Sequence, residues 1–98
     1  VLKRLKQYNG IAQESNNKET LDAILLLAKT EGIFTEPAGG VSVAVLKKMV
    51  EDGQIDKDET TVCYVTGNGL KATESIMEVL SRPEVMQPDV AKISAVVK

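Results

Sequence analysis

A β-branched, apolar run from Thr60 to Val65 passes directly into a glycine-containing turn at 66–69 and then into a segment with helical spacing. The run does not alternate between apolar and polar residues, which is typical of a strand covered on both faces. A helix is expected over about 70–80. Its expected buried positions are Ala72, Ile76, Met77 and Leu80. A strand, a glycine turn and a helix make half of a βαβ unit, so an α/β fold is predicted.

Two further helices are predicted in the first half of the chain. Asn16 and Glu19 have the spacing of a capping box, and Gly32 ends the apolar pattern that follows them. The apolar positions of this helix recur on one face and are Leu21, Ile24, Leu25 and Ala28. The second helix is expected over residues 41–52, where apolar residues give way to charged ones before Gly53.

The two ends of the chain are less regular. Residues 1–8 have helical spacing and are followed by an Asn-Gly pair, which predicts the last turns of a helix and its end. Because the chain starts at Val1 without an initiator methionine and directly in this helix, we expect it to begin within a longer protein. Residues 85–98 fit either a closing strand or a short helix that starts at Pro88 and Asp89.

Composition excludes several classes of function. The net charge of −2, with both signs interspersed, provides no basic stripe for nucleic acid and no polybasic patch for a membrane surface. The single cysteine, Cys63, cannot form an internal disulfide, and without histidine the usual zinc-ligand sets cannot be assembled, so no metal site is expected. The apolar stretches are too short to span a bilayer. A soluble protein in a reducing, cytoplasmic setting is therefore predicted.

The turn after the predicted strand is the first candidate site. Open α/β sheets bind ligands at the carboxyl ends of their strands, and glycines before a helix expose N–H groups to anions. Gly67, Gly69 and Ala72 match one variant of the dinucleotide fingerprint. The acidic residue that a dinucleotide site needs would be Asp89, which follows Pro88 in the wrong context, so we reject that function. A strand-to-helix turn also uses glycine for positive φ whether or not a ligand binds.

The second candidate site surrounds Glu36, which stands between the apolar Phe34 and a proline. Its carboxylate is expected to be less solvated than the other acids of the chain, and such groups often have a function. Alternatively, it stabilises the amino end of the helix expected near Gly39, and the residues alone favour this second role. Gly39 and Gly40 expose backbone N–H groups that a ligand or a neighbouring segment can approach closely.

Two motifs in this order resemble a known family. EGIFTEPAGGVSVAVLKKMVEDGQIDKDE followed by a strand and TGNGLK resembles the carboxy-terminal region of threonine synthases, which are fold type II pyridoxal-phosphate enzymes. The resemblance covers roughly Asn17 to Ala72. It implies that residues 1–98 form a single domain that is a fragment of a larger pyridoxal-phosphate-dependent catalytic domain. The fold implied is a partial three-layer α/β/α sheet unit.

The resemblance also implies roles for particular residues. The residue at the position of Thr66 places its hydroxyl against the pyridine nitrogen of pyridoxal 5'-phosphate, and this contact tunes the cofactor as an electron sink. Gly67, Asn68 and Gly69 are expected to hold that hydroxyl in place, and Glu36 to lie near the cofactor. The Schiff-base lysine and the phosphate-binding loop of the family lie upstream, so no residue of this chain is assigned as catalytic.

The implied activity belongs to the parent chain. A threonine synthase is a lyase that converts O-phospho-L-homoserine and water to L-threonine and phosphate, and the fragment alone is expected to be inactive and not to retain the cofactor. Its expected partners are the remainder of the enzyme and, at exposed sheet edges, other copies in a homo-oligomer. Two alternatives stay open: a related enzyme such as cysteate synthase or threonine dehydratase, and a freestanding module that binds or senses a small molecule.

Overall fold

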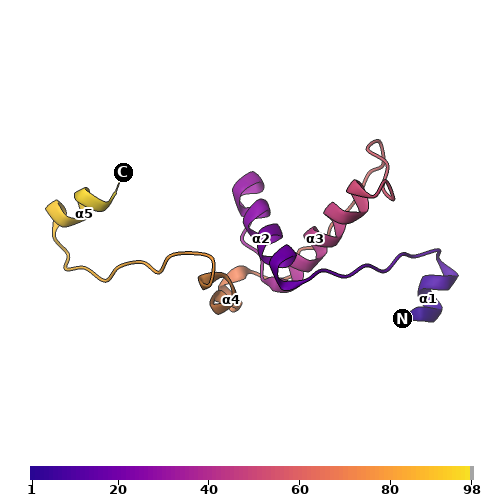
Figure 1. The fold of residues 1–98 in the computed structure, drawn as a ribbon, viewed down its shortest axis with the longest axis horizontal. Coiled ribbons are helices and arrows are strands. Elements are labelled where there is room, and N and C mark those ends of the chain that lie inside the picture. Colours follow the sequence, from indigo (N-terminus) through magenta and orange to yellow (C-terminus); the bar gives the residue numbers. More distant parts are fainter. Residues whose placement is uncertain (98) are drawn as a thin grey trace.

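The computed structural model describes residues 1–97, and the regular elements in this range are helices (Figure 1). In chain order they are α1 (Leu2–Gln7), α2 (Asn17–Glu31), α3 (Pro37–Glu51), the 3₁₀ helix η1 (Gly69–Lys71), α4 (Thr73–Met77) and α5 (Val90–Val96). Helices α2 and α3 pack against each other in the middle of the molecule, and α1 and α5 lie at opposite ends. The undecided segment after residue 84 therefore contains a helix, with Asp89 as its N-cap.

Helix α2 begins and ends where its sequence signals predict. The Asn16 side chain accepts a hydrogen bond from the Glu19 N–H at 2.8 Å, and the Glu19 carboxylate accepts one from the Asn16 N–H at 2.9 Å. This reciprocal pair is a complete capping box, which satisfies two N–H groups that the helix itself leaves free. At the other end Gly32 adopts a left-handed conformation with φ of 69°. Both predictions are confirmed.

Helix α3 begins four residues earlier than predicted, at Pro37 rather than Val41. Proline suits the first helical position because its fixed φ is helical and its missing N–H would have no partner there. Gly39 and Gly40 thus lie within the first turn and are buried. The predicted close approach to a neighbouring segment is confirmed for Gly40, because a Cβ there would lie 2.6 Å from Cγ1 of Ile24 in α2, whereas Gly39 contacts Thr35, which precedes the same helix.

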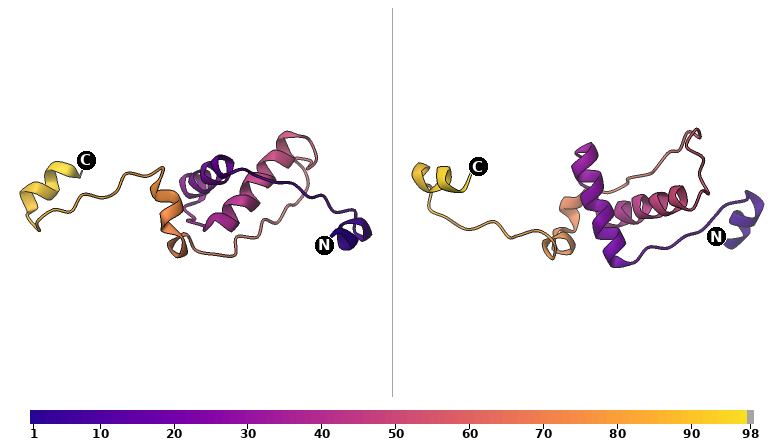
Figure 2. Two further views of the ribbon diagram at one scale, coloured as in Figure 1. Left: turned by 60° about the horizontal axis from the view of Figure 1, so that its bottom comes forward. Right: turned by 45° about the horizontal axis from the view of Figure 1, so that its top comes forward.

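The core of the molecule lies between these two helices. Ala23 and Ile24 of α2 and Ala44 of α3 are each less than 5% exposed. Burial of Ile24 alone contributes about 1.5–3 kcal/mol. Figure 2 shows α2 crossing α3, with the short α4 beside this pair, and α4 adds the buried Ile76.

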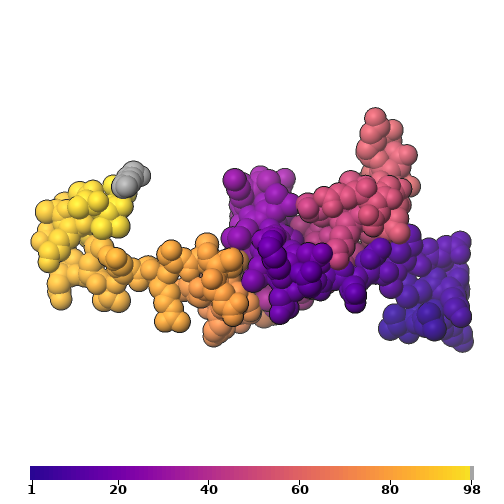
Figure 3. All heavy atoms as spheres, viewed as in Figure 1, coloured from indigo at the N-terminus to yellow at the C-terminus, as the bar shows by residue number. Residues whose placement is uncertain are grey.

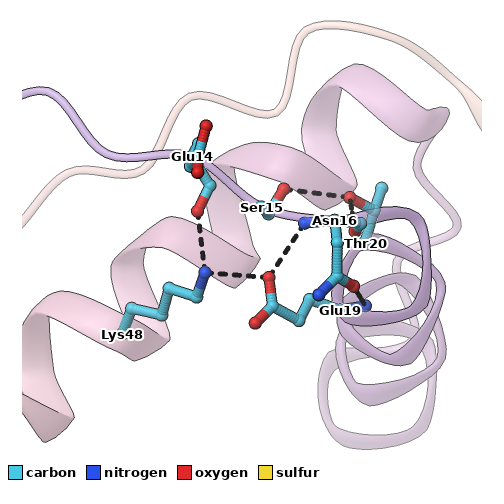
Figure 4. Close-up of polar contacts among 6 residues, drawn as sticks. All are labelled: Glu14, Ser15, Asn16, Glu19, Thr20 and Lys48. Carbon is cyan, nitrogen blue, oxygen red and sulfur yellow. Dashed lines mark hydrogen bonds and ion pairs between the residues drawn. The ribbon is translucent and has the colours of Figure 1, made fainter.

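A polar network joins the far end of α3 to the start of α2 (Figure 4). The Lys48 ammonium pairs with the Glu19 carboxylate at 2.8 Å and also donates to the backbone carbonyl of Glu14 at 2.8 Å. Glu19 is therefore shared between the capping box and the ion pair. The hydroxyls of Ser15 and Thr20 lie 3.0 Å apart beside this network. The first turn of α2 is in this way attached to α3.

The predicted strand from Thr60 to Val65 is not formed. These residues are extended, and the β contact within residues 1–97 is a single antiparallel bridge between Thr35 and Asn68. A strand requires a neighbour that accepts and donates its backbone hydrogen bonds, and the described part of the chain supplies none alongside 60–65. The partial three-layer sheet unit is consequently not assembled by this chain alone.

The helix predicted after the turn is also shorter than expected. In place of one helix over about 70–80, η1 is followed by α4, which ends at Met77. Of the four expected buried positions, Ile76 is buried and Ala72 is half-buried, whereas Met77 and Leu80 are 37% and 47% exposed. After α4 the chain leads away from the α2–α3 pair (Figure 1).

The molecule as a whole is elongated, as the space-filling view shows (Figure 3). Its extents are 62 × 27 × 19 Å and its radius of gyration is 18.1 Å, whereas a compact domain of 100 residues has a radius of gyration of about 13 Å. Its accessible surface is 8096 Å², compared with about 5,500 Å² for a compact protein of this mass. Among the helices described, none combines the length and apolar character needed to cross a membrane.

Candidate functional site

The two segments singled out from the sequence lie side by side. The Glu36 N–H donates to the Gly67 carbonyl at 3.0 Å, and the Gly69 N–H donates to the Phe34 carbonyl at 3.0 Å. The antiparallel bridge of residues 35 and 68 lies between these two hydrogen bonds. We call residues 34–36 and 67–69 the paired segments. The paired segments are more than 30 positions apart in the chain, and their backbones are hydrogen-bonded to each other at the amino end of α3.

Gly67 and Gly69 are required for space rather than for backbone conformation. Neither has a positive φ among the described residues, so the expected conformational reason is wrong for both. A Cβ on Gly67 would overlap the Glu36 carboxyl group, and a Cβ on Gly69 would overlap the Phe34 ring. Each glycine therefore contacts a side chain of the opposite segment. A larger residue at either position would displace the side chain opposite it.

Glu36 occupies the N-cap position of α3, but within residues 1–97 its side chain makes no capping hydrogen bond. The carboxylate instead packs against Gly67, and one of its oxygens lies 3.8 Å from the Lys71 ammonium. Its side chain is 23% exposed, the lowest value for a carboxylate in the four ion pairs described. The predicted low solvation is confirmed. Glu36 stands at the amino end of the helix, as the alternative role expects, but its side chain packs against Gly67 and makes no capping hydrogen bond among the described residues.

Thr66 and Asn68 alternate with the two glycines. Thr66 is exposed and lies where the extended segment enters the paired segments. Asn68 is also exposed, and its side-chain oxygen accepts a hydrogen bond from the Leu70 N–H at 2.9 Å, which makes it the N-cap of η1. Asn68 thus fixes the turn locally, while the Thr66 side chain lies at a surface that a ligand can reach.

One residue of the site is not predicted from the sequence. Thr35 is 1% exposed, and its hydroxyl oxygen lies 3.2 Å from the Gly67 carbonyl oxygen. A polar residue between Phe34 and Glu36 carries no periodic signal, because its burial depends on contacts with residues 67–68. The sequence feature that could have indicated a buried Thr35 is the glycine at position 39, because a Cβ there would overlap the Thr35 hydroxyl.

The chemistry available here is that of polar groups next to the paired segments. These groups are an exposed hydroxyl at Thr66, a half-buried carboxylate at Glu36 and the Lys71 ammonium, which lies 3.8 Å from that carboxylate. Such groups can hydrogen-bond to a ligand and orient it. The residues that the sequence grouped as a cofactor site, 36 and 66–69, are thus brought together.

Comparison with known proteins identifies the family. Residues 1–67 match the model of the family described as "Pyridoxal-phosphate dependent enzyme". The threonine synthase of Methanocaldococcus jannaschii is 39% identical over 91% of this chain and 22% of its own length. That of Halalkalibacterium halodurans is 43% identical over 83% of this chain and 23% of its own length.

A third relative, the threonine synthase of Bacillus sp. (strain ULM1), is 48% identical over 67% of this chain and 19% of its own length. The chain spans about a quarter or less of the length of these relatives. The resemblance inferred from the two motifs is confirmed, and the α/β class of the family agrees with the predicted class. Because the family model covers two thirds of its residues, this chain belongs to the pyridoxal-phosphate dependent enzymes.

Proposed function

We propose that this chain is the carboxy-terminal part of a threonine synthase. The complete enzyme would convert O-phospho-L-homoserine and water to L-threonine and phosphate with pyridoxal phosphate as cofactor. The proposal is supported by relatives that carry this name and match most of the chain at 37–43% identity. The finer fold proposed is a three-layer unit in which residues 60–65 pair with strands from the rest of the enzyme.

Within that enzyme the chain provides the edge of the site that holds the pyridine nitrogen. The Thr66 hydroxyl would hold the ring nitrogen by donating a hydrogen bond to it, which suits a neutral, unprotonated nitrogen. A carboxylate there would favour the protonated ring and a stronger electron sink. The position of that hydroxyl is fixed by the turn of Gly67, Asn68 and Gly69. Glu36 packs against Gly67 from the opposite segment. Pyridoxal phosphate, when bound, supplies the electron sink that stabilises negative charge on the substrate carbons.

The observation that carries this proposal is the pairing of residues 34–36 with 67–69. The hydrogen-bonded pairing begins directly after Thr66, and Thr66 itself is exposed. A hydroxyl of this kind suits an aromatic nitrogen, because it can donate one hydrogen bond without carrying charge. The residues present therefore fit the nitrogen edge of the cofactor.

The remaining functions are assigned to the rest of the enzyme. No lysine of this chain is proposed to bind the cofactor covalently, and no segment of it to hold the phosphate groups of cofactor or substrate. The chain alone is proposed to be inactive. Its proposed partners are the remainder of the enzyme chain and, in a homo-oligomer, further copies of that enzyme.

The test is Thr66→Ala in the complete enzyme. Loss of the hydroxyl should lower kcat about tenfold or more, since one hydrogen bond to the reacting system is removed. The cofactor should remain bound, as measured by its absorbance after gel filtration, because its other contacts lie elsewhere. The matched control is Thr30→Ala, which removes an exposed threonine hydroxyl bonded to the Leu26 carbonyl in α2. Unchanged kcat and unchanged absorbance in Thr66→Ala would remove Thr66 from the site.

A further inference from the structure

Thr35 is a buried polar residue that the proposed cofactor contacts do not use. Together with Ile24 it is one of the two largest side chains that are almost completely buried, with 1% exposure each. A buried hydroxyl is costly unless it is hydrogen-bonded. The partners of this hydroxyl therefore indicate why a threonine is present there.

Both partners are backbone carbonyls next to the site. The Thr35 hydroxyl oxygen lies 3.2 Å from the Gly67 carbonyl oxygen and 3.2 Å from the Glu36 carbonyl oxygen. The Gly67 carbonyl also accepts the Glu36 N–H at 3.0 Å. The Gly67 carbonyl can therefore accept from two adjacent residues, with the single proton of the Thr35 hydroxyl shared between it and the Glu36 carbonyl. The peptide group that follows Gly67 is fixed in orientation as a result.

Thr35 packs against the first turn of α3. A Cβ on Gly39 would overlap the Thr35 hydroxyl and would lie 3.3 Å from its methyl carbon. The absence of a side chain at position 39 leaves the space that Thr35 fills. Threonine is also stiff about χ1, because two heavy atoms branch at its Cβ. The hydroxyl oxygen therefore has one position, within reach of both the Gly67 and the Glu36 carbonyl.

We propose that Thr35 is a positioning residue for Thr66. It acts through Gly67, the next residue along the chain, whose carbonyl it holds. When the Thr35 hydroxyl is removed, the backbone at Gly67 loses one of its two donors and Thr66 is no longer held in a single position. This inference rests on the proposed function, in which the Thr66 hydroxyl meets the ring nitrogen.

The experiment is a double-mutant cycle in the complete enzyme with Thr35→Val, Thr66→Ala and the double variant. Thr35→Val keeps the shape of the side chain and removes the hydroxyl. It should lower kcat about tenfold and shift the absorbance maximum of the bound cofactor in the same direction as Thr66→Ala. In the Thr66→Ala background it should cause no further loss, because the group that it positions is already gone.

Two further variants separate positioning from stability. Thr20→Val is the matched control, since Thr20 is also buried and its hydroxyl donates to the Asn16 carbonyl at 2.9 Å, away from the site. It should lower the melting temperature without changing kcat or the absorbance maximum. Thr35→Ser keeps the hydroxyl and removes the methyl group, so its kcat and spectrum should equal those of the unmodified enzyme even when it is less stable.

The outcomes are distinguishable. An equal loss from Thr35→Val in both backgrounds, or no loss in either, overturns the positioning role while Thr66 keeps its own. A tenfold loss of kcat in Thr35→Ser overturns it as well, and this result is available even when Thr35→Val does not fold. Unchanged kinetics and unchanged absorbance in Thr66→Ala remove Thr66 from the proposed site and overturn this inference with it.

Discussion

At the scale of single residues, the site depends on glycines that make room for side chains of another segment. Gly67 leaves space for the Glu36 carboxyl group and Gly69 leaves space for the Phe34 ring. The hydrogen bonds between the same segments, Glu36 to Gly67 and Gly69 to Phe34, are 3.0 Å long and depend on this close approach. The glycines and the side chains opposite them therefore act as matched pairs.

Gly67→Ala should disturb this pairing. The new methyl group would overlap the Glu36 carboxyl, so the Glu36 side chain or the backbone must shift, at a cost of about 1–3 kcal/mol in the free energy of unfolding. In the complete enzyme, kcat should fall as well, because Thr66 precedes the altered residue. Steady-state kinetics and chemical denaturation would measure the two effects.

A suitable control for this substitution is Gly53→Ala. Gly53 has a φ of 72°, and a methyl group added to it would have no heavy atom within 4 Å, so alanine there causes backbone strain without a collision. The strain should cost about 1 kcal/mol and leave kcat unchanged. Normal kcat in Gly67→Ala would contradict the proposed role of close packing at the site.

At the scale of secondary-structure elements, helices whose signals are local can be predicted and contacts between distant segments cannot. The capping box of Asn16 and the left-handed Gly32 set both ends of α2 from neighbouring residues alone. The predicted start of α3 is wrong because it gives the glycine pair more weight than Pro37, which is the stronger signal for a first helical position. The strand expected at 60–65 is absent for a different reason, since its partners are not encoded nearby.

The site is predicted in part for the same reason. Residues 36 and 66–69 are grouped through their motifs, and the structure brings these motifs together. Thr35 is missed because its burial follows from a hydrogen bond to a residue 32 positions away. No pattern within one segment reports such a contact.

The contact between α2 and α3 makes a pH-dependent contribution to stability. The Lys48 ammonium and, after it, the Asn16 N–H hold the pKa of the Glu19 carboxyl below its ordinary value of 4.5. Because the folded-state pKa is the lower one, the stabilisation is present above pH 4.5 and is lost as the pH falls through the folded-state pKa. Acid should therefore weaken the attachment of α2 to α3.

Glu19→Gln tests this expectation. The amide retains an oxygen that can accept from the Asn16 N–H but loses the charge that pairs with Lys48. In the complete enzyme the variant should melt below the unmodified protein at pH 7, and the difference should shrink as the pH falls below 4.5. Glu51→Gln, which affects an exposed pair with Lys47, serves as the control and should cause a smaller change. A difference between Glu19→Gln and the unmodified protein that does not vary with pH would contradict the role of this ion pair.

At the scale of the whole molecule, the chain exposes more apolar surface and more unpaired backbone than a compact domain does. The segments before α2 and after α4, here called the amino-terminal and carboxy-terminal arms, carry exposed apolar side chains. The extended segment 60–65 leaves backbone groups without strand partners in the described residues. The exposed apolar residues of the carboxy-terminal arm include Val85, Val90, Val96 and Val97. These features fit the proposal that the rest of a larger enzyme covers them.

The isolated 98-residue chain should accordingly remain extended in solution. Small-angle X-ray scattering should give a radius of gyration of 18.1 Å or more, well above the value of about 13 Å for a compact domain of this length. The chain should show no absorbance from added pyridoxal phosphate beyond that of the free cofactor. A compact, cooperatively folding chain that binds the cofactor would contradict the proposed dependence on the rest of the enzyme.

The contact between Thr66 and the cofactor can be observed in a crystal structure of the complete enzyme with pyridoxal phosphate bound. The distance from the Thr66 hydroxyl oxygen to the pyridine nitrogen should be about 2.7–3.0 Å, which is the range of a hydrogen bond. Residues 34–36 and 67–69 should be paired as they are here. A ring nitrogen that faces another residue, with the Thr66 hydroxyl more than about 4 Å away, would contradict the site proposed for this chain.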